Sequence, residues 1–178
     1  MKLIAGFFLS FLTLFPVQNP LDVDEVTHVE MILKSLSYDS KITGGTVLVI
    51  SRSGSNANSN KVATALSGKS IKKVPVELFQ LEFVSMSSLD PIVNGNIKVD
   101  LVYLCNDLTN VQLAQLNQFC TKNKIVSATG VARFVEDGYA CLSVVKEEGK
   151  VKPLVHLDKL KELDHNFSSS YLKLCKIM

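Results

Sequence analysis

The sequence predicts an α/β fold: a three-layer domain with a mostly parallel central sheet, helices on both faces and an antiparallel hairpin at one edge. Residues 46–50 and 99–105 are continuous aliphatic runs without polar alternation, which is typical of central strands covered on both sides. Helical segments separate such runs, and this alternation favours parallel βαβ units with right-handed crossovers. Residues 139–145 and 150–156 flank a short turn at residues 147–149, which predicts the hairpin.

The other elements follow in order along the chain. A first helix is predicted over residues 21–38, because Val26, Val29 and Leu33 recur at helical spacing. Further predicted segments are a helix over 57–67, a strand over 74–83, an irregular connector over 86–95, a helix over 109–123 capped by Thr109 or Asn110, and strands over 125–128 and 133–136, the latter closed by a tight turn at Gly138. A serine-capped terminal helix over 168–178 is expected to close one side of the sheet. The alternative is a partner-binding groove beside the first helix.

Composition and charge restrict the class of protein. The chain has 178 residues, of which 47% are apolar and 20% charged, as in an ordinary globular domain. The net charge is +2, basic residues are scattered among acidic ones, and there is no tryptophan, so nucleic acid is not an expected partner. No linker is long enough to divide the chain, and residues 19–178 are predicted to form one domain.

The first 18 residues predict a secretory signal peptide. Met1 and Lys2 give a basic start, and residues 3–15 form an apolar run that carries no charge and is short for a membrane span. No small-x-small cleavage motif follows, and residues 16–19 are a poor substitute that would allow a cut near Gln18. The alternative is an uncleaved membrane anchor. Either interpretation places the folded domain in the periplasm or otherwise outside the cytoplasm.

The cysteines are disulfide candidates. An even number in an exported protein permits two disulfides, and four cysteines can pair in three ways. They are Cys105, Cys120, Cys141 and Cys175. All four also lie on apolar faces, where free cysteine is commonly buried. Disulfide bonds and buried free thiols are therefore equally well supported by the sequence. No pair has C-x-x-C spacing and the three histidines are scattered, so no metal site is predicted.

Polar residues follow the first predicted strand, at the edge where parallel sheets bind ligands. Ser51, Arg52 and Ser53 offer hydroxyls and a guanidinium just before a helix, an arrangement that favours a phosphate or a carboxylate. The same rim is expected to carry Asn106, Thr129 and Gly130. The loop has neither a G-x-G-x-x-G pattern nor a Walker-type lysine, and an ordinary solvated loop is the competing interpretation.

No catalytic set emerges from the sequence. His28 is predicted on the surface of the first helix, His156 at a strand end and His165 in the bend between the last two helices, and no nucleophile elbow accompanies them. Arg133 and Asp137 flank a short turn, where they can pair. A non-enzymatic protein without a cofactor is therefore predicted.

The C-terminal pattern carries a family resemblance. Gly138 precedes the hairpin, residues 150–157 lead from a strand into a helix, and residues 168–174 begin a serine-capped helix. This series resembles the YfiR-like periplasmic regulators, from about Val26 onward and most clearly from residue 124 to the end. His156 stands where the family usually has asparagine, and Gly138 where it often has a glycine pair.

The resemblance implies a periplasmic α/β protein that represses an inner-membrane diguanylate cyclase by binding its periplasmic sensory region. Members of the family act in cyclic-di-GMP signalling, and some are dimers with regulatory disulfides. A homodimer is therefore implied here as well. The spacing of the four cysteines does not reproduce a hairpin disulfide, so redox control is not implied.

Two hypotheses about function follow. The first is an exported, non-catalytic regulator that represses or informs a membrane signalling protein, a cyclase or a sensor kinase, by favouring its inactive arrangement. The alternative is an envelope ligand-binding sensor module for a small anionic molecule, bound at the strand-end rim. Substituting Arg52 should abolish ligand binding under the alternative and leave partner binding largely intact under the first hypothesis.

Overall fold

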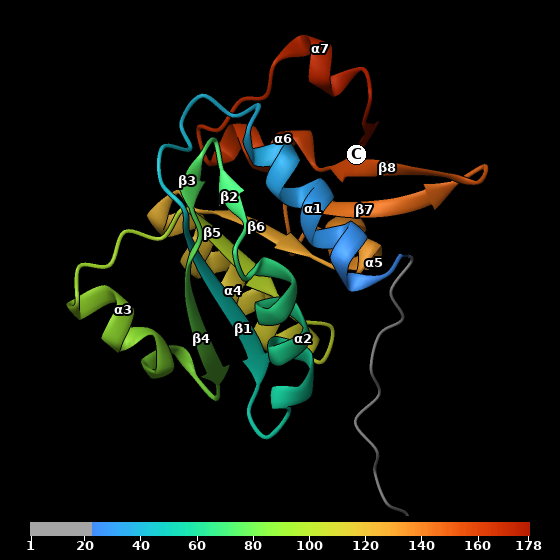
Figure 1. Cartoon of the computed structure of the whole chain (residues 1–178). Helices are drawn as coiled ribbons and strands as arrows, with labels where there is room; N and C mark the ends of the chain where they lie inside the picture. Colours follow the sequence, from blue (N-terminus) through green and yellow to red (C-terminus); the bar gives the residue numbers. More distant parts are fainter. Residues whose placement is uncertain (1–22) are drawn as a thin grey trace, which may run out of the picture.

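The computed structural model describes residues 23–178, so the predicted leader, residues 1–18, lies outside the described residues. The described part contains a seven-stranded sheet with the order β4-β1-β5-β6-β7-β8-β9 (Figure 1). Its strands are β1 (Thr46–Arg52), β4 (Glu77–Phe83), β5 (Leu101–Leu104), β6 (Val126–Thr129), β7 (Leu142–Glu147), β8 (Lys150–Val155) and β9 (Lys176–Ile177). Neighbouring strands from β4 to β7 are parallel, β8 is antiparallel to β7, and β9 adds parallel to β8. The predicted fold class is confirmed, with β9 lying outside the predicted hairpin.

Helices cover both faces of this sheet. They are α1 (Glu25–Leu36), α2 (Asn56–Leu66), the 3-10 turn η1 (Met86–Leu89), α3 (Asp90–Asn94), α4 (Asn110–Asn123), α5 (Ala132–Glu136), α6 (Leu157–Glu162) and α7 (Ser169–Leu172). Two hydrophobic clusters form the core: α1, α2, α6 and α7 pack on one face, and α3, α4 and α5 on the other. Figure 1 shows α1 and α2 in front of the sheet and α4 behind it. Within β1, Val49 faces α1 and α2, whereas Ile50 faces α4, as strand alternation requires.

Local sequence signals set several helix ends. Thr109 caps α4 in a reciprocal arrangement: its hydroxyl accepts from the Gln112 amide at 3.4 Å, and the Gln112 side chain accepts from the Thr109 amide at 3.0 Å. Ser168 caps α7 by accepting from the Tyr171 amide at 3.3 Å. Both predicted caps are confirmed.

Some predicted elements differ from the structure. Residues 133–136 form α5, not a strand, because the chain must cross over one face to pass from β6 to the parallel β7. Arg133 and Asp137 lie one turn apart on this helix and pair at 3.2 Å. The predicted strand over 74–83 divides into β3 (Val74–Pro75), which pairs with β2 (Ser70–Ile71), and β4. The predicted connector over 86–95 contains η1 and α3, and the predicted terminal helix ends at Leu172, after which β9 pairs with β8.

Within residues 23–178 the four cysteines are free thiols, so the second of the two interpretations, unpaired cysteines, is the one that the structure has. Cys105 and Cys141 belong to the core on the α1 side of the sheet, and Cys120 belongs to the core on the α4 side. Burial raises the pKa of all three thiols and keeps them protonated. They act as small apolar side chains in the two cores.

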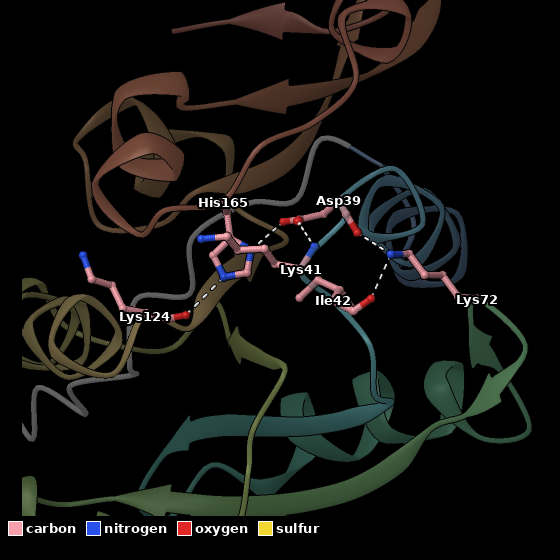
Figure 2. A network of polar contacts seen from close by, with 6 residues as sticks. All are labelled: Asp39, Lys41, Ile42, Lys72, Lys124 and His165. Carbon is pink, nitrogen blue, oxygen red and sulfur yellow. Dashed lines mark hydrogen bonds and ion pairs between the residues drawn. The ribbon is translucent and has the colours of Figure 1, made fainter.

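A buried polar cluster fastens the C-terminal segment to the connection between α1 and β1 (Figure 2). The carboxylate of the fully buried Asp39 meets His165 Nδ1 at 2.5 Å and accepts from the Lys41 amide at 2.8 Å. His165 Nε2 lies 3.1 Å from the Lys124 carbonyl oxygen. Both ring nitrogens thus face oxygen atoms that can accept a hydrogen bond. Lys72 Nζ donates to two carbonyl oxygens of the same connection, one of them that of Asp39.

No helix within residues 23–178 is long and apolar enough to cross a membrane.

Candidate functional site

The strand order marks one place where a ligand can bind. From β1 the chain passes through α2 to β4 on one side, and then through α3 to β5 on the other side of β1. In open α/β sheets, ligands bind in the crevice outside the carboxyl ends of the strands at such a reversal. Here that crevice lies where β1 ends at Arg52 and β5 ends at Leu104.

Ser51 and Arg52 end β1 but lie on opposite faces of the sheet. Ser51 shares the face of Val49 and is 1% exposed, and its Oγ has no hydrogen-bond partner. Arg52 shares the face of Ile50 and is exposed. Its backbone amide donates to Asp107 Oδ1 at 3.3 Å. Strand alternation therefore separates the two side chains that were expected to act on one ligand.

The loop after β1 donates hydrogen bonds to a carboxylate of the protein itself. Glu82, at the end of β4, accepts through Oε2 from the Gly54 amide and from Ser53 Oγ, each at 3.1 Å. These hydrogen bonds, with another from the Asn56 side chain, hold the pKa of the Glu82 carboxyl below its ordinary value. Within this loop, the Ser53 hydroxyl and the Gly54 amide thus bind a carboxylate of the protein itself.

A small hollow lies between α1, α2 and the ends of β5 and β6. Its lining includes Glu25, Asn58, Tyr103, Cys105, Asn106 and Gly130. The hollow measures about 10 Å³, roughly the room that one water molecule needs. Two of the predicted rim residues, Asn106 and Gly130, thus meet in one place. The third, Thr129, is fully buried, and its Oγ1 accepts from the Val131 amide at 3.2 Å.

A second, more open hollow lies on the other side of the first turn of α2. It measures about 190 Å³, and its lining includes Ser51, Asn56, Ser59, Asn60, Gln80 and Glu82. The second hollow is lined mainly by polar side chains, whereas Val62 and Cys105 also line the first. The start of α2 therefore stands between two recesses at the carboxyl edge.

Three buried polar atoms at this edge lack a hydrogen-bond partner. They are Ser51 Oγ, Asn58 Nδ2 and Asp107 Oδ2, and no other buried side-chain atom of the described part of the chain shares this condition. The three residues are 1%, 8% and 4% exposed. Each such atom costs about 1–3 kcal/mol relative to a paired one. Water or a ligand that enters from solution can supply partners to such atoms.

A chain of polar side chains leads from the hollow into the core. The Tyr103 hydroxyl donates to Glu25 Oε1 at 2.9 Å and lies 3.1 Å from His28 Nδ1. His28 Nε2 lies 3.4 Å from Ser143 Oγ. Because the tyrosine proton is used on Glu25, His28 donates through Nδ1 and accepts from Ser143 through Nε2, which is the neutral form of the ring. The prediction that His28 is a surface residue is wrong: α1 turns it onto the sheet, and it is 1% exposed.

Burial sets the protonation of this chain. It lowers the pKa of His28 to about 4, which agrees with the neutral ring. Burial also raises the pKa of the Glu25 carboxyl, although the hydrogen bond from Tyr103 acts in the opposite direction. Ser143 is 1% exposed. A buried hydroxyl of this kind is not placed to attack a substrate, and the chain orients Glu25 at the wall of the hollow.

Glu25, Asn58 and Tyr103 carry no sequence signal for binding. Glu25 fits the acidic first turn of a helix, Tyr103 fits a buried strand, and Asn58 fits the polar face of a helix. Only the docking of α1 and α2 on the sheet brings them together. A polar residue in the first turn after a strand that ends at a topological reversal is the one hint that the sequence contains.

The other histidines have structural roles. His156 caps α6, where its Nδ1 accepts from the Lys159 amide at 3.4 Å. His165 is the partner of Asp39 described above. No group of three or more His, Cys, Asp or Glu side chains among residues 23–178 is placed to hold a metal ion.

Replacing Glu82 with alanine is expected to create phosphate binding in the loop after β1. The substitution frees the Gly54 amide and the Ser53 hydroxyl, which now serve the carboxylate. Titration with inorganic phosphate, followed by amide NMR, should shift the Gly54 and Ser53 signals of the variant and leave those of the wild type in place. A Glu77→Ala variant, altered at the other end of β4, is the control. Equal responses of variant and wild type would show that the loop does not bind anions when vacated.

Comparisons with known proteins support the fold. No protein-family model matches this chain, and no curated protein sequence matches it significantly. One similar solved structure is the ABC domain in complex with L-Trp from Streptococcus pneumoniae, with a TM-score of 0.62 and 15% identity over 86% of this chain and 62% of that one. Another is the ligand-free, open structure of a substrate-binding protein with adhesive properties from Clostridium difficile, with a TM-score of 0.55 and 15% identity over 76% of this chain and 55% of that one. The chain thus spans less than two thirds of either structure, and the likeness at this identity is one of fold.

Proposed function

We propose that this protein is an exported binding module for a small polar molecule, held at the carboxyl edge of the sheet between β1 and β5, and that it has no catalytic activity. The observation that carries the proposal is the set of buried polar atoms without partners, Ser51 Oγ, Asn58 Nδ2 and Asp107 Oδ2. A ligand that supplies a partner to one or more of these atoms recovers free energy that the unoccupied protein lacks. Export is supported by the leader pattern in residues 1–18.

The similar solved structures agree with this proposal. One was determined with L-Trp bound and the other is described as a substrate-binding protein. Neither likeness identifies the ligand of this chain. Amino acids nevertheless belong in the first set of compounds to test, together with nucleotides, sugars and inorganic phosphate.

An Asn58→Leu variant should separate binding from stability. Leucine has a similar volume and no polar atom, so the substitution removes a buried donor without a partner and is expected to leave stability unchanged or raise it by about 1 kcal/mol. A bound ligand at a hundred times its Kd stabilises the wild type by about 2.7 kcal/mol. Thermal unfolding with the compound set should show this stabilisation in the wild type and lose it in the variant.

The matched control is Asn123→Leu at the exposed end of α4, remote from the edge. It should keep the full response to any compound that stabilises the wild type. If Asn58→Leu lowers stability and still responds to the same compound, the unpartnered amide has another role and the proposal fails.

The regulator hypothesis remains a second proposal, because local features fit the family resemblance. Gly138 adopts φ +76 at the turn before β7, as a family glycine would, and His156 makes the cap that an asparagine could make at that place. Crosslinking in intact cells with identification of the captured proteins tests this hypothesis. A membrane protein with a cyclase or kinase domain would support it, and recovery of this protein alone or as a dimer would favour the ligand-binding module.

A further inference from the structure

The ionisable side chains at the site are mainly acidic. Glu25 lines the small hollow, whose lining in the described structure includes neither lysine nor arginine. Asp107 lies 3.3 Å from the Arg52 amide at the end of β1, and one of its carboxylate oxygens has no partner. Glu82 fills the neighbouring loop. Arg52 lies on the opposite face of the sheet. Burial raises the pKa of Glu25, and this effect is larger than that of the Lys61 charge, which lowers it.

This charge distribution argues against an anionic ligand. A phosphate at the loop after β1 would have to displace Glu82, and a carboxylate in the hollow would face Glu25. Like charges in a partly buried site repel more strongly than in water. A positively charged group would instead gain the Glu25 carboxylate as a partner. Its charge would also lower the pKa of Glu25 and so oppose the effect of burial, which raises it.

The size of the hollow restricts the group further. Its volume of about 10 Å³ suits a group no larger than one water molecule. An ammonium group has about that size and three donors, and a guanidinium does not fit. Glu25 Oε1 is fixed in direction by the Tyr103 hydroxyl at 2.9 Å, so the wall is organised before anything binds.

Asn58 provides an independent observation. It lines the same hollow, it is 8% exposed, and its Nδ2 has no partner. Rotation of the amide presents either a donor or an acceptor to a ligand. A ligand with an oxygen acceptor beside its amine would use this side chain as well as Glu25.

We propose that the ligand is recognised through a primary ammonium group that enters the hollow against Glu25, with an adjacent oxygen acceptor at Asn58, so that the site takes amino acids and related amines and rejects phosphates and carboxylates without an amine. This proposal rests on the binding function proposed above and names its ligand class.

The test is isothermal titration calorimetry of the full chain with probes matched around the amine. The probes are the L-amino acids, 2-phenylethylamine, 3-phenylpropionate and inorganic phosphate. At least one amino acid should bind, and its binding should weaken by about tenfold or more in Glu25→Gln, because a charge-assisted hydrogen bond is lost. L-Phenylalanine and 2-phenylethylamine should bind more tightly than 3-phenylpropionate, which has no amine.

Glu30→Gln is the matched control on the same helix. Glu30 pairs with Lys69 at 2.6 Å on the solvent side of α1, so this variant should bind like the wild type. Because glutamine can still accept from Tyr103, the Glu25→Gln variant should fold, and its thermal midpoint without ligand checks this.

Two results would overturn the ligand class. Binding of 3-phenylpropionate or phosphate that depends on Asn58 and is unaffected by Glu25→Gln would keep the binding function and reject the amine. The same conclusion would follow if no amine bound and another class of compound stabilised the protein in a manner that depends on Asn58. If no compound binds, both proposals fail.

Discussion

Replacing Asp39 with alanine is expected to lower the free energy of unfolding by about 2–6 kcal/mol, because two buried polar groups lose their partner. Asp39 is fully buried and is the partner of His165 at 2.5 Å. Its removal leaves His165 Nδ1, on a ring that is 8% exposed, without its hydrogen-bond partner. It also leaves the Lys41 amide without its acceptor. Each buried polar group that loses its partner costs about 1–3 kcal/mol, because it stays desolvated.

Urea unfolding of the wild type and the variant measures this difference. The matched control is Asp158→Ala, which removes an exposed pair with Lys161 at 3.3 Å and should cost less than about 1 kcal/mol. A loss of similar size in both variants would show that the Asp39 cluster does not hold the C-terminal segment in place. Asp39→Ala should also increase protease sensitivity between α6 and α7, where His165 lies.

His28 is expected to make the protein lose about 3 kcal/mol of stability as the pH falls from 7 to 4. Burial lowers its pKa in the folded state to about 4, and Asp24 opposes this effect only in part. In the unfolded chain the ordinary value is about 6.5. The folded pKa is therefore the lower of the two, and between these values the unfolded state binds a proton that the folded state does not. Stability is unaffected by this group above about pH 6.5 and falls as the pH drops through the window.

The comparison with a His28→Gln variant isolates this contribution. Glutamine can still hydrogen-bond to Tyr103 and Ser143, the two partners of the ring, and it does not titrate. Carboxylates whose pKa is lowered by hydrogen bonds, such as Glu82 and Glu147, also destabilise the protein in acid, and they do so in both proteins. The variant should be less stable at pH 7 and should lose less stability on acidification. Parallel pH profiles for the two proteins would contradict the assignment of a neutral, buried His28.

The central strands and their covering helices were predictable from the sequence because their signals are local. Residues 46–50 form a run that only a doubly covered strand accommodates, and Thr109 with Gln112 forms a cap from side chains three positions apart. Residues 133–136 were misassigned because four residues with two adjacent apolar side chains satisfy a short strand and a short helix equally well. The crossover from β6 to β7 decides between them, and it is a property of the sheet.

The candidate site divides in the same way. The polar character of the carboxyl edge was predictable from the sequence, because the polar residues directly follow β1, β5 and β6 in the chain. Which of these polar side chains face one another depends on the tertiary structure. It placed Arg52 and Ser51 on opposite faces, brought Glu82 from β4 into the loop that was expected to hold an anion, and joined Glu25 of α1 to Tyr103 of β5 at 2.9 Å. Such contacts connect residues 28 to 78 positions apart in the sequence. They form because the helices dock on the sheet, and this docking is driven by the burial of apolar surface. The free energy gained by that burial exceeds the cost of the polar side chains that it brings together at the edge of the sheet.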